Sequence, residues 1–285
     1  YNTTDEFMLG IGFYNSALIK IRLSFIIMPM YSVGLNSVAG SAKINYNIYP
    51  SKLFDKINLT GTASVFSGYK KIEPSVKFNI KPKSVRYGAK QDFRIAYTTI
   101  FTDENIYSDT SLRLTTYYEK RSGIISANYH YSTGDAIKSL NISLGLNSMP
   151  GSFLQPETEI SFSYQYLKKN FINIRSYLGG FISKPDSLFP TYRLNMYGST
   201  DNLMNEIYID RAQKSEIVTG FERQTDNQQG AFKSYVPFDT DKWIAALNLQ
   251  ADIPKTPFAI YWDYGAIADD KKLFFGAGLI FQIIR

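Results

Sequence analysis

A period-two alternation of apolar and small polar residues recurs along almost the whole chain. Residues 42–48 read Ala-Lys-Ile-Asn-Tyr-Asn-Ile, and residues 140–146 read Leu-Asn-Ile-Ser-Leu-Gly-Leu. Because successive side chains of a β-strand point to opposite faces, a strand with such a sequence presents two chemically different faces. Helix-period segments are almost absent between the repeats, so the chain is expected to close into a barrel or to pack as a sandwich.

About fourteen segments carry this alternation, and they define the expected strands. These are residues 6–15, 23–33, 37–49, 56–67, 69–81, 91–102, 110–120, 123–132, 138–148, 155–167, 170–182, 243–253, 258–268 and 273–285. One face carries Ile, Leu, Val, Phe and Tyr, and the other carries Ser, Thr, Asn, Gly and scattered charges, which favours lipid outside and water inside. The predicted fold class is therefore all-β, a closed antiparallel transmembrane β-barrel of about 14 strands, with a range of roughly 12 to 16.

The length and the composition agree with one barrel domain spanning residues 1–285. A barrel strand with its loop takes about 20 residues, so 285 residues suit the expected strand number. The mean hydropathy of −0.19 resembles that of a soluble protein, but half of every barrel strand faces a polar lumen. No run approaches the roughly 20 apolar residues of a membrane-spanning helix. The 22 Tyr and 20 Phe suit aromatic girdles at the membrane interfaces.

The predicted connections between strands alternate in length. Tight turns are expected at residues 121–123 and 168–170, and longer charged loops at residues 81–90 and 103–109. Short turns at one rim and long loops at the other are typical of an up-and-down membrane barrel.

Residues 183–241 are the exception to the alternation. They are rich in Pro, Asn, Asp and Gln, and a structureless loop of this length is improbable within a compact domain. We expect this insertion to contain one or two strands and a large loop that folds over a rim or into the lumen. It is the best candidate for functional specialisation.

Catalytic chemistry is not expected in this chain. His130 is the only histidine and cysteine is absent, so neither a zinc-binding His-Glu-x-x-His motif nor a Ser-His-Asp or Cys-His arrangement can be assembled. The sequence therefore predicts a protein that is not an enzyme, with no catalytic residue, no cofactor and no metal site.

Four basic residues are predicted to face the lumen. Arg94, Arg113, His130 and Arg175 share the polar phase of their strands, opposite to neighbours such as Ile95. Such arginines select anions, pair with a plug, or cross-link the lumen to carboxylates such as Glu119 and Glu159. In each case, exposing an arginine to lipid near the midplane would cost roughly 2–4 kcal/mol, so these residues define which face points inward.

The net charge of +6 is spread along the chain rather than gathered in a stripe. Nucleic acid is therefore not an expected partner. The charge favours anionic headgroups, so the expected partners are outer-membrane lipid, lipopolysaccharide and other envelope proteins. No signal peptide opens the sequence, and we expect the chain to be the C-terminal part of a longer protein.

The last three expected strands contain WIAALNLQADIP (residues 243–254), FAIYWDYGA (258–266) and LFFGAGLIF (273–281). In this order they resemble the end of the BamA/TamA superfamily of outer-membrane barrels, although an Arg-Gly-Phe/Tyr lumen-loop tripeptide is missing. The resemblance implies a structural barrel-closure motif formed by Asp263, Gly265, Gly276 and Gly278. These residues would alternatively reflect a close backbone approach where a loop enters the barrel, or simply mark bends and crowded crossings. Closure is expected to pair residues 6–15 antiparallel with residues 273–285, which would satisfy the backbone groups of every strand.

A second resemblance covers more of the chain. The segments FMLGIGFYN (7–15), IMPMY (27–31), YNIYP (46–50), YRLNMY (192–197) and DNL (201–203) are similar to the C-terminal outer-membrane barrel that follows gluzincin-type metallopeptidase domains in Gram-negative envelope proteins. This resemblance implies a barrel that anchors a peptidase-like domain located ahead of residue 1.

The expected function is thus an outer-membrane β-barrel that anchors such a domain or serves as a membrane subunit of an envelope complex. Three alternatives remain open at this point: a BamA-like assembly or translocation barrel, a passive channel, and a soluble barrel or sandwich. The last alternative would bury Ile44, Leu140, Leu144 and Phe162 together in a water-soluble core.

Overall fold

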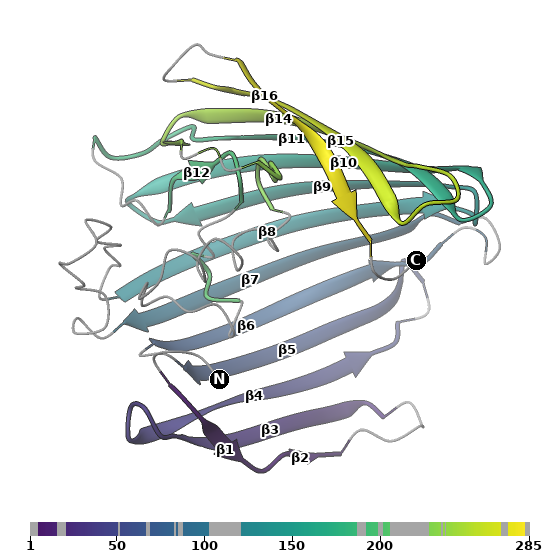
Figure 1. The fold of residues 1–285 in the computed structure, drawn as a ribbon. Helices are drawn as coiled ribbons and strands as arrows, with labels where there is room; N and C mark the ends of the chain where they lie inside the picture. The colour runs from purple at the N-terminus through teal and green to yellow at the C-terminus, as the bar shows by residue number, and fades with distance from the viewer. Residues whose placement is uncertain are drawn as a thin grey trace.

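The computed structural model describes residues 5–15, 21–50, 52–66, 69–82, 84, 88–102, 121–186, 192–198, 202–205, 228–234, 236, 238–268 and 273–282. Within these residues the fold is all-β and its strand pairs are antiparallel, which confirms the predicted secondary-structure class (Figure 1). No described segment forms a helix that is long and apolar enough to cross a membrane.

Sixteen strands are present in the described residues. They are β1 (Met8–Gly10), β2 (Phe13–Tyr14), β3 (Leu23–Ser32), β4 (Ser37–Ile48), β5 (Phe54–Phe66), β6 (Tyr69–Ile80), β7 (Lys90–Thr102), β8 (Arg121–Gly134), β9 (Lys138–Met149), β10 (Phe153–Leu167), β11 (Asn170–Gly180), β12 (Leu194–Asn195), β13 (Asp239–Thr240), β14 (Trp243–Asp252), β15 (Phe258–Ile267) and β16 (Leu273–Phe281). Every predicted range except 110–120, which lies outside the described residues, coincides with one or two of these strands.

Fourteen of the strands form one meandering sheet, and β12 and β13 form a separate two-stranded sheet. β1 and β2 both pair with β3 in one common register, in which Gly10 faces Met30 and Phe13 faces Ile27. They therefore share a single position, and the sheet has thirteen strand positions from β1/β2 to β16. Connections between successive strands lie alternately at two rims. We call the rim that holds the β3–β4, β7–β8 and β11–β14 connections the insertion rim, and the opposite rim the turn rim.

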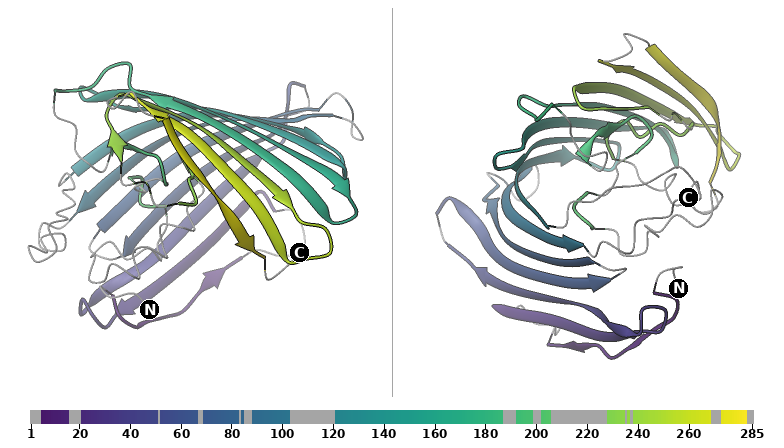
Figure 2. Two further views of the ribbon diagram at one scale, coloured as in Figure 1. Left: turned by 45° about the horizontal axis from the view of Figure 1, so that its top comes forward. Right: turned by 90° about the vertical axis from the view of Figure 1, so that its left-hand side faces the viewer.

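The large sheet curls around the β12–β13 region, so that it has a concave inner face and a convex outer face (Figure 2). Large apolar side chains remain exposed on the outer face: Ile44 is 50% exposed and Leu144 is 45% exposed. Phe162 is exposed as well, and Leu140 is half-buried. The four residues that a water-soluble core would have buried together are thus spread over the outside of the curved sheet, which argues against the soluble alternative.

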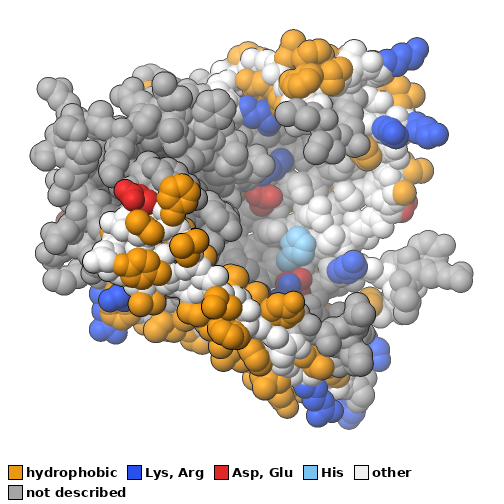
Figure 3. All heavy atoms as spheres, turned by 60° about the horizontal axis from the view of Figure 1, so that its bottom comes forward, with side chains coloured by type: hydrophobic (Ala, Val, Ile, Leu, Met, Phe, Trp, Pro, Cys, Tyr) orange, Lys and Arg blue, Asp and Glu red, His pale blue; other side chains and the backbone are white. Residues whose placement is uncertain are grey.

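The inner face is polar along most of its length. Neighbouring strands are joined there by side-chain hydrogen bonds, such as that from Thr60 Oγ1 to Asn45 Oδ1 at 2.9 Å and that from Asn58 Nδ2 to Asn47 Oδ1 at 2.8 Å. Figure 3 shows the contrast: hydrophobic side chains crowd the outside, whereas polar side chains, with the histidine in pale blue, line the central hollow. A ladder of hydroxyl and amide groups satisfies its own hydrogen bonds and also tolerates water.

The turn rim contains the short β8–β9 and β10–β11 hairpins but also the β6–β7 connection at residues 81–89. The long loop predicted at residues 81–90 therefore lies at the opposite rim from the connection that contains residues 103–109, so the predicted separation of short turns and long loops is wrong for this loop. Between β8 and β9, the Asp135 carboxylate accepts hydrogen bonds from the backbone N–H groups of Ile137 at 2.8 Å and Lys138 at 2.9 Å. The backbone N–H of Lys138, followed by that of Ile137, holds the pKa of the Asp135 carboxyl below its ordinary value, because both favour the charged form. Between β10 and β11, Lys169 adopts a positive φ of 68°, so the tight turn predicted near residues 168–170 is confirmed.

The tight turn predicted at residues 121–123 is wrong, because these residues extend β8 toward the insertion rim. Arg121 pairs with Phe101 of β7, and its guanidinium lies 5.4 Å from the centre of the Phe101 ring. A cation–π contact of this kind holds the extended chain against β7. Gly123 lies within the strand and leaves room for the Tyr97 side chain of β7, since a Cβ at this position would meet the Tyr97 hydroxyl oxygen at 2.8 Å.

The predicted antiparallel pairing of residues 6–15 with residues 273–285 is also wrong in its direction. All thirteen strand positions alternate in direction, and an odd number of alternating strands leaves the first and the last parallel. β7 pairs directly with β8, so no strand lies between these two in the sheet, and the predicted count of fourteen falls by one. Among the described residues, β16 pairs with β15 alone, so closure of the sheet stays a prediction.

Gly40 provides a test of the register between β3 and β4. Its φ is +135°, and a Cβ on Gly40 would lie 2.1 Å from the backbone oxygen of Met28. We expect Gly40→Ala to lower the free energy of unfolding by roughly 1–3 kcal/mol, measured by urea unfolding. Gly61→Ala is the matched control, because no atom lies within 4 Å of the position of its added Cβ. Equal unfolding midpoints for the two variants would contradict the assigned register.

Candidate functional site

The insertion between β11 and β14 folds onto the inner face of the large sheet (Figure 1). Its short strands β12 and β13 pair with each other, with Leu194 opposite Thr240. One or two strands are predicted within this segment, and β12 and β13 are two. The described parts of the insertion enter the concave side, so the inner face near the insertion rim is covered by the protein's own chain.

Apolar contacts hold the insertion at three separate places on the wall. Leu194, Met196 and Phe232 pack against β11, β14 and β15, where the wall residues are Tyr177, Ile244, Ala246 and Ile267. Tyr192 packs against Ile124, Met149 and Phe153 of β8, β9 and β10. Met204 packs against Ala39, Phe66, Tyr69 and Ile100 of β4, β5, β6 and β7. The insertion therefore contacts the wall from β4 around to β15.

A buried carboxylate anchors residues 228–234 of the insertion. Asp263 of β15 is 0% exposed. Its Oδ2 accepts the backbone N–H of Lys233 at 2.9 Å, and its Oδ1 accepts the Asn248 side-chain amide at 2.9 Å. The same Asn248 amide donates to the backbone oxygen of Gly230 at 3.1 Å. Lys233 Nζ lies 3.8 Å from Asp263 Oδ1 and balances the buried charge.

Two glycines of the predicted closure motif make room for this segment. A Cβ on Gly265 would lie 2.6 Å from the Met196 sulfur, and one on Gly276 would lie 3.0 Å from the Ser234 hydroxyl oxygen. Because these two glycines have no side chain, the Met196 and Ser234 side chains of the insertion can lie directly against the wall. Gly278 makes room for the ring of Tyr261 at 2.7 Å. The structure places all four motif residues on the inner face beneath or beside the insertion.

Arg175 connects the Asp263 anchor to the carboxylates of β10. Its Nη1 donates to Asn248 Oδ1 at 2.9 Å, and its Nη2 donates to Glu159 Oε2 at 2.5 Å. The guanidinium also lies 5.6 Å from the centre of the Tyr177 ring. An adjacent inner cavity of about 420 Å³ is lined by Arg175 and Asn248 and by seven other polar residues, Ser139, Asn141, Ser161, Ser163, Asn173, Lys233 and Gln250, together with the apolar residues Phe162, Ile174, Ala231 and Leu249. The wall below the insertion therefore presents many hydrogen-bonding groups beside apolar surface.

Arg94 belongs to a second charged cluster, on β6 and β7. It forms an ion pair with Glu73, which also accepts a hydrogen bond from Thr98 Oγ1 at 2.9 Å. Lys71 Nζ lies 3.3 Å from Glu73 and donates to Asn205 Oδ1 of the insertion at 2.5 Å. This cluster holds residues 202–205 as the Asp263 site holds residues 228–234.

The remaining predicted inner-face residues have different outcomes. His130 Nδ1 lies 3.1 Å from Ser143 Oγ, and His130 is the register partner of Asp92 on β7. Its surroundings are those of a hydrogen-bonded wall residue. Arg113 and Glu119 lie outside the described residues. Within the described part of the chain, no group of three or more His, Asp or Glu side chains is arranged to hold a metal ion.

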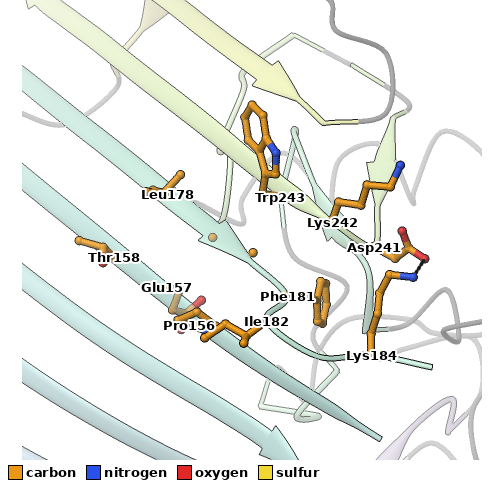
Figure 4. Close-up of a pocket in the computed structure, with 12 residues that line it drawn as sticks. Pro156, Glu157, Thr158, Leu178, Phe181, Ile182, Lys184, Asp241, Lys242 and Trp243 are labelled. Atoms are coloured by element: carbon orange, nitrogen blue, oxygen red, sulfur yellow. Dashed lines mark ion pairs between the residues drawn. The ribbon is translucent and has the colours of Figure 1, made fainter. Parts of the chain in front are cut away.

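The two ends of the insertion are held together at the rim. Lys184 Nζ lies 2.8 Å from Asp241 Oδ2, and the Phe181 backbone N–H donates to the Lys242 carbonyl at 2.7 Å. Beside this ion pair lies a cavity of about 360 Å³, whose lining includes Leu178 and Trp243 (Figure 4). The insertion is therefore fixed at its base as well as at its docking sites.

Several residues at the docking sites could not be identified from the sequence. Met196 and Asn248 lie within segments quoted for the two family resemblances, but nothing local indicates that Asn248 and Lys233 meet Asp263 or that Met196 and Phe232 pack beside Gly265. The available signal was the small and apolar run Gly230–Ala231–Phe232 within a polar stretch. Such a run in a long loop indicates a segment that packs against a wall.

Comparison with known proteins assigns no family to the chain. No protein-family model matches it, and no curated protein matches it. Among solved structures, CdiB from Acinetobacter baumannii is similar with a TM-score of 0.40 and 12% sequence identity over 90% of this chain. The chain spans 46% of that CdiB chain. The predicted resemblances to the BamA/TamA superfamily and to peptidase-associated barrels therefore stay predictions.

Replacing the buried anchor tests the docking site. In Asp263→Ala, the Lys233 N–H and the Asn248 amide lose their acceptor in a buried place, which costs roughly 2–4 kcal/mol. We expect residues 228–234 to gain backbone hydrogen exchange, measured by mass spectrometry. Asp239→Ala is the control, because its 3.2 Å ion pair with Arg193 is exposed and contributes under about 1 kcal/mol. Unchanged protection in Asp263→Ala would exclude the proposed anchoring role of this carboxylate.

Proposed function

We propose that the chain forms the wall of a transmembrane β-barrel in a Gram-negative outer membrane and that its own insertion occupies the interior. The observation that carries this proposal is the division of the sheet into an apolar exposed outer face and a polar inner face. Leu144 and Ile160 are exposed on the outside, whereas Asn141 and Ser161 line the inner cavity. Lipid on one side and water on the other satisfy both faces.

The lengths of the connections orient this barrel. The two longest connections of the large sheet, residues 103–120 and 181–242, both lie between strands that meet at the insertion rim, whereas the longest connection at the turn rim is the β6–β7 connection at residues 81–89. Outer-membrane barrels have short periplasmic turns and longer extracellular loops. We therefore assign the insertion rim to the cell exterior and the turn rim to the periplasm.

The occupied interior favours a membrane anchor or a subunit of an envelope complex over a passive channel. Apolar contacts at three places, together with the Asp263 and Lys71 sites, hold the insertion across the inner face. The partner that the sequence resemblance implies is a peptidase-like domain of the same protein. An encoded His-Glu-x-x-His helix ahead of residue 1 would support the anchor role, and a signal peptide directly ahead of residue 1 would exclude it.

A translocation path gated by the insertion is the second candidate. It is favoured by the cavity of about 420 Å³ beside Arg175, whose lining includes hydroxyl, amide and charged side chains from four neighbouring strands, β9, β10, β11 and β14. The insertion is held there partly by hydrogen bonds, and water in an opened interior could replace them, because folding exchanges protein–water for protein–protein hydrogen bonds. The two candidates differ in whether the insertion leaves its site during function.

Paired arginine substitutions on β10 test the membrane assignment. Ile160→Arg places a charge on the outer face near the middle of the strand and is expected to destabilise the folded protein in lipid bilayers by roughly 2–4 kcal/mol. Ser161→Arg is the adjacent control, because this side chain lines the inner cavity and meets water there. Stability is measured by urea unfolding in lipid vesicles. If Ile160→Arg were tolerated as well as Ser161→Arg, the outer face would not contact lipid.

Conductance separates the anchor from the passive channel. We expect the full-length protein to show little ion conductance in planar bilayers, because the insertion covers the inner face at one rim. Asp263→Ala weakens one docking site and is expected to raise the frequency of open events. Asp239→Ala again serves as the control. A large, steady conductance of the unsubstituted protein would support the passive channel instead.

A further inference from the structure

The two edges of the large sheet lack strand partners among the described residues. The β1/β2 strand forms one edge and pairs with β3, and β16 forms the other edge and pairs with β15. Outer-face side chains at these edges are among the most exposed of the molecule: Leu9 is 73% exposed and Leu273 is 88% exposed. In a bilayer, the unpaired backbone groups of each edge would cost several kcal/mol apiece. Both edges therefore require a partner.

The directions of the edges restrict what this partner can be. β1 begins at the insertion rim, where Met8 faces Ser32, and β16 also begins at that rim, directly after the β15–β16 connection. The two edges are thus parallel to each other. A strand that is antiparallel to one edge is antiparallel to the other, so an all-antiparallel barrel needs an odd number of further strands between them.

We infer that an odd number of further strands of the same polypeptide, N-terminal to β1, fills the gap between β1 and β16. This inference rests on the proposed membrane location. An odd number of strands ahead of β1 brings the start of the barrel to the turn rim, the rim at which β16 ends. Both ends of the barrel then lie on the proposed periplasmic side. Additional strands after β16 would instead leave both ends at the exterior, so that a free chain end would have to cross the bilayer.

The side chains at the two edges determine the sequence pattern that the inferred strands must have. Because the outer side chains of both edges are apolar, as at Phe13 and Phe275, a filling strand must alternate apolar residues facing lipid with polar or small residues facing the interior. Each such strand needs about 9–11 residues to cross the bilayer.

Disulfide scanning tests the inference, and the absence of cysteine from the chain simplifies it. In the full-length protein in membranes, cysteines replace Leu9, Ile11 or Phe13 on one edge and Leu273, Phe275 or Leu279 on the other, one from each edge at a time. Two control pairs use register partners: Leu9→Cys with Tyr31→Cys, and Tyr264→Cys with Phe275→Cys. We expect the control pairs to form disulfides on oxidation and every pair across the gap to form none.

A third cysteine, moved through the apolar positions of the upstream segment, identifies the occupant. We expect it to join Leu9→Cys in the same molecule. Direct disulfides between the two edges would overturn the inference in favour of parallel closure, and disulfide-linked dimers would overturn it in favour of a second copy. Edge cysteines that join no upstream position would overturn it too. Extraction of the protein from membranes by alkaline carbonate would instead refute the proposed function, whichever disulfides form.

Discussion

Backbone hydrogen bonding in a two-faced sheet is the constraint on which the rest of this structure depends. Each strand presents apolar residues on its outer face and hydroxyl, amide or charged residues on its inner face, so a shift of one residue in any pairing would exchange the two environments. The inner ladder from Asn45 to Thr60 and the outer row that includes Ile44 follow from the same register. The order and pairing of the strands are therefore strongly specified, even though many inner residues contact only polar neighbours.

The inner face changes character where the insertion docks. Near the insertion rim, Ile100, Ile124 and Ile244 are buried on the side that is polar elsewhere, and apolar insertion residues cover them. Asp263 lies at the border between these two regions, where its carboxylate accepts a backbone N–H of the insertion and an amide of the wall. The hydrogen bonds of Asp263 fix the position of the insertion on the wall. Most of the apolar surface that the insertion buries lies in the surrounding clusters.

The structure shows what surrounds the four residues of the predicted closure motif, whose role in closure stays a prediction. The sequence resemblance assigns Asp263, Gly265, Gly276 and Gly278 to closure of the barrel, but their inner-face positions adjoin the insertion or an aromatic ring. Closure of the sheet depends on a strand partner for the two parallel edges, and it stays a prediction. β15 and β16 therefore take part in two separate features: their inner faces contact the insertion, and the edge formed by β16 is where the sheet would have to be completed.

The sequence by itself determined the strand class, nearly every strand range and the inner placement of Arg94, His130 and Arg175, because alternation is a local signal that each strand carries independently. It mistook residues 121–123 for a turn, since their pairing with β7, where Gly123 lies beside the Tyr97 side chain, is a contact with another strand. Only the tertiary structure decided that the Asp263 carboxylate accepts a hydrogen bond from the Lys233 backbone N–H and that the edge strands run parallel. Both facts depend on contacts between residues far apart in the chain and on the total number of strands, and neither leaves a periodic trace in the sequence.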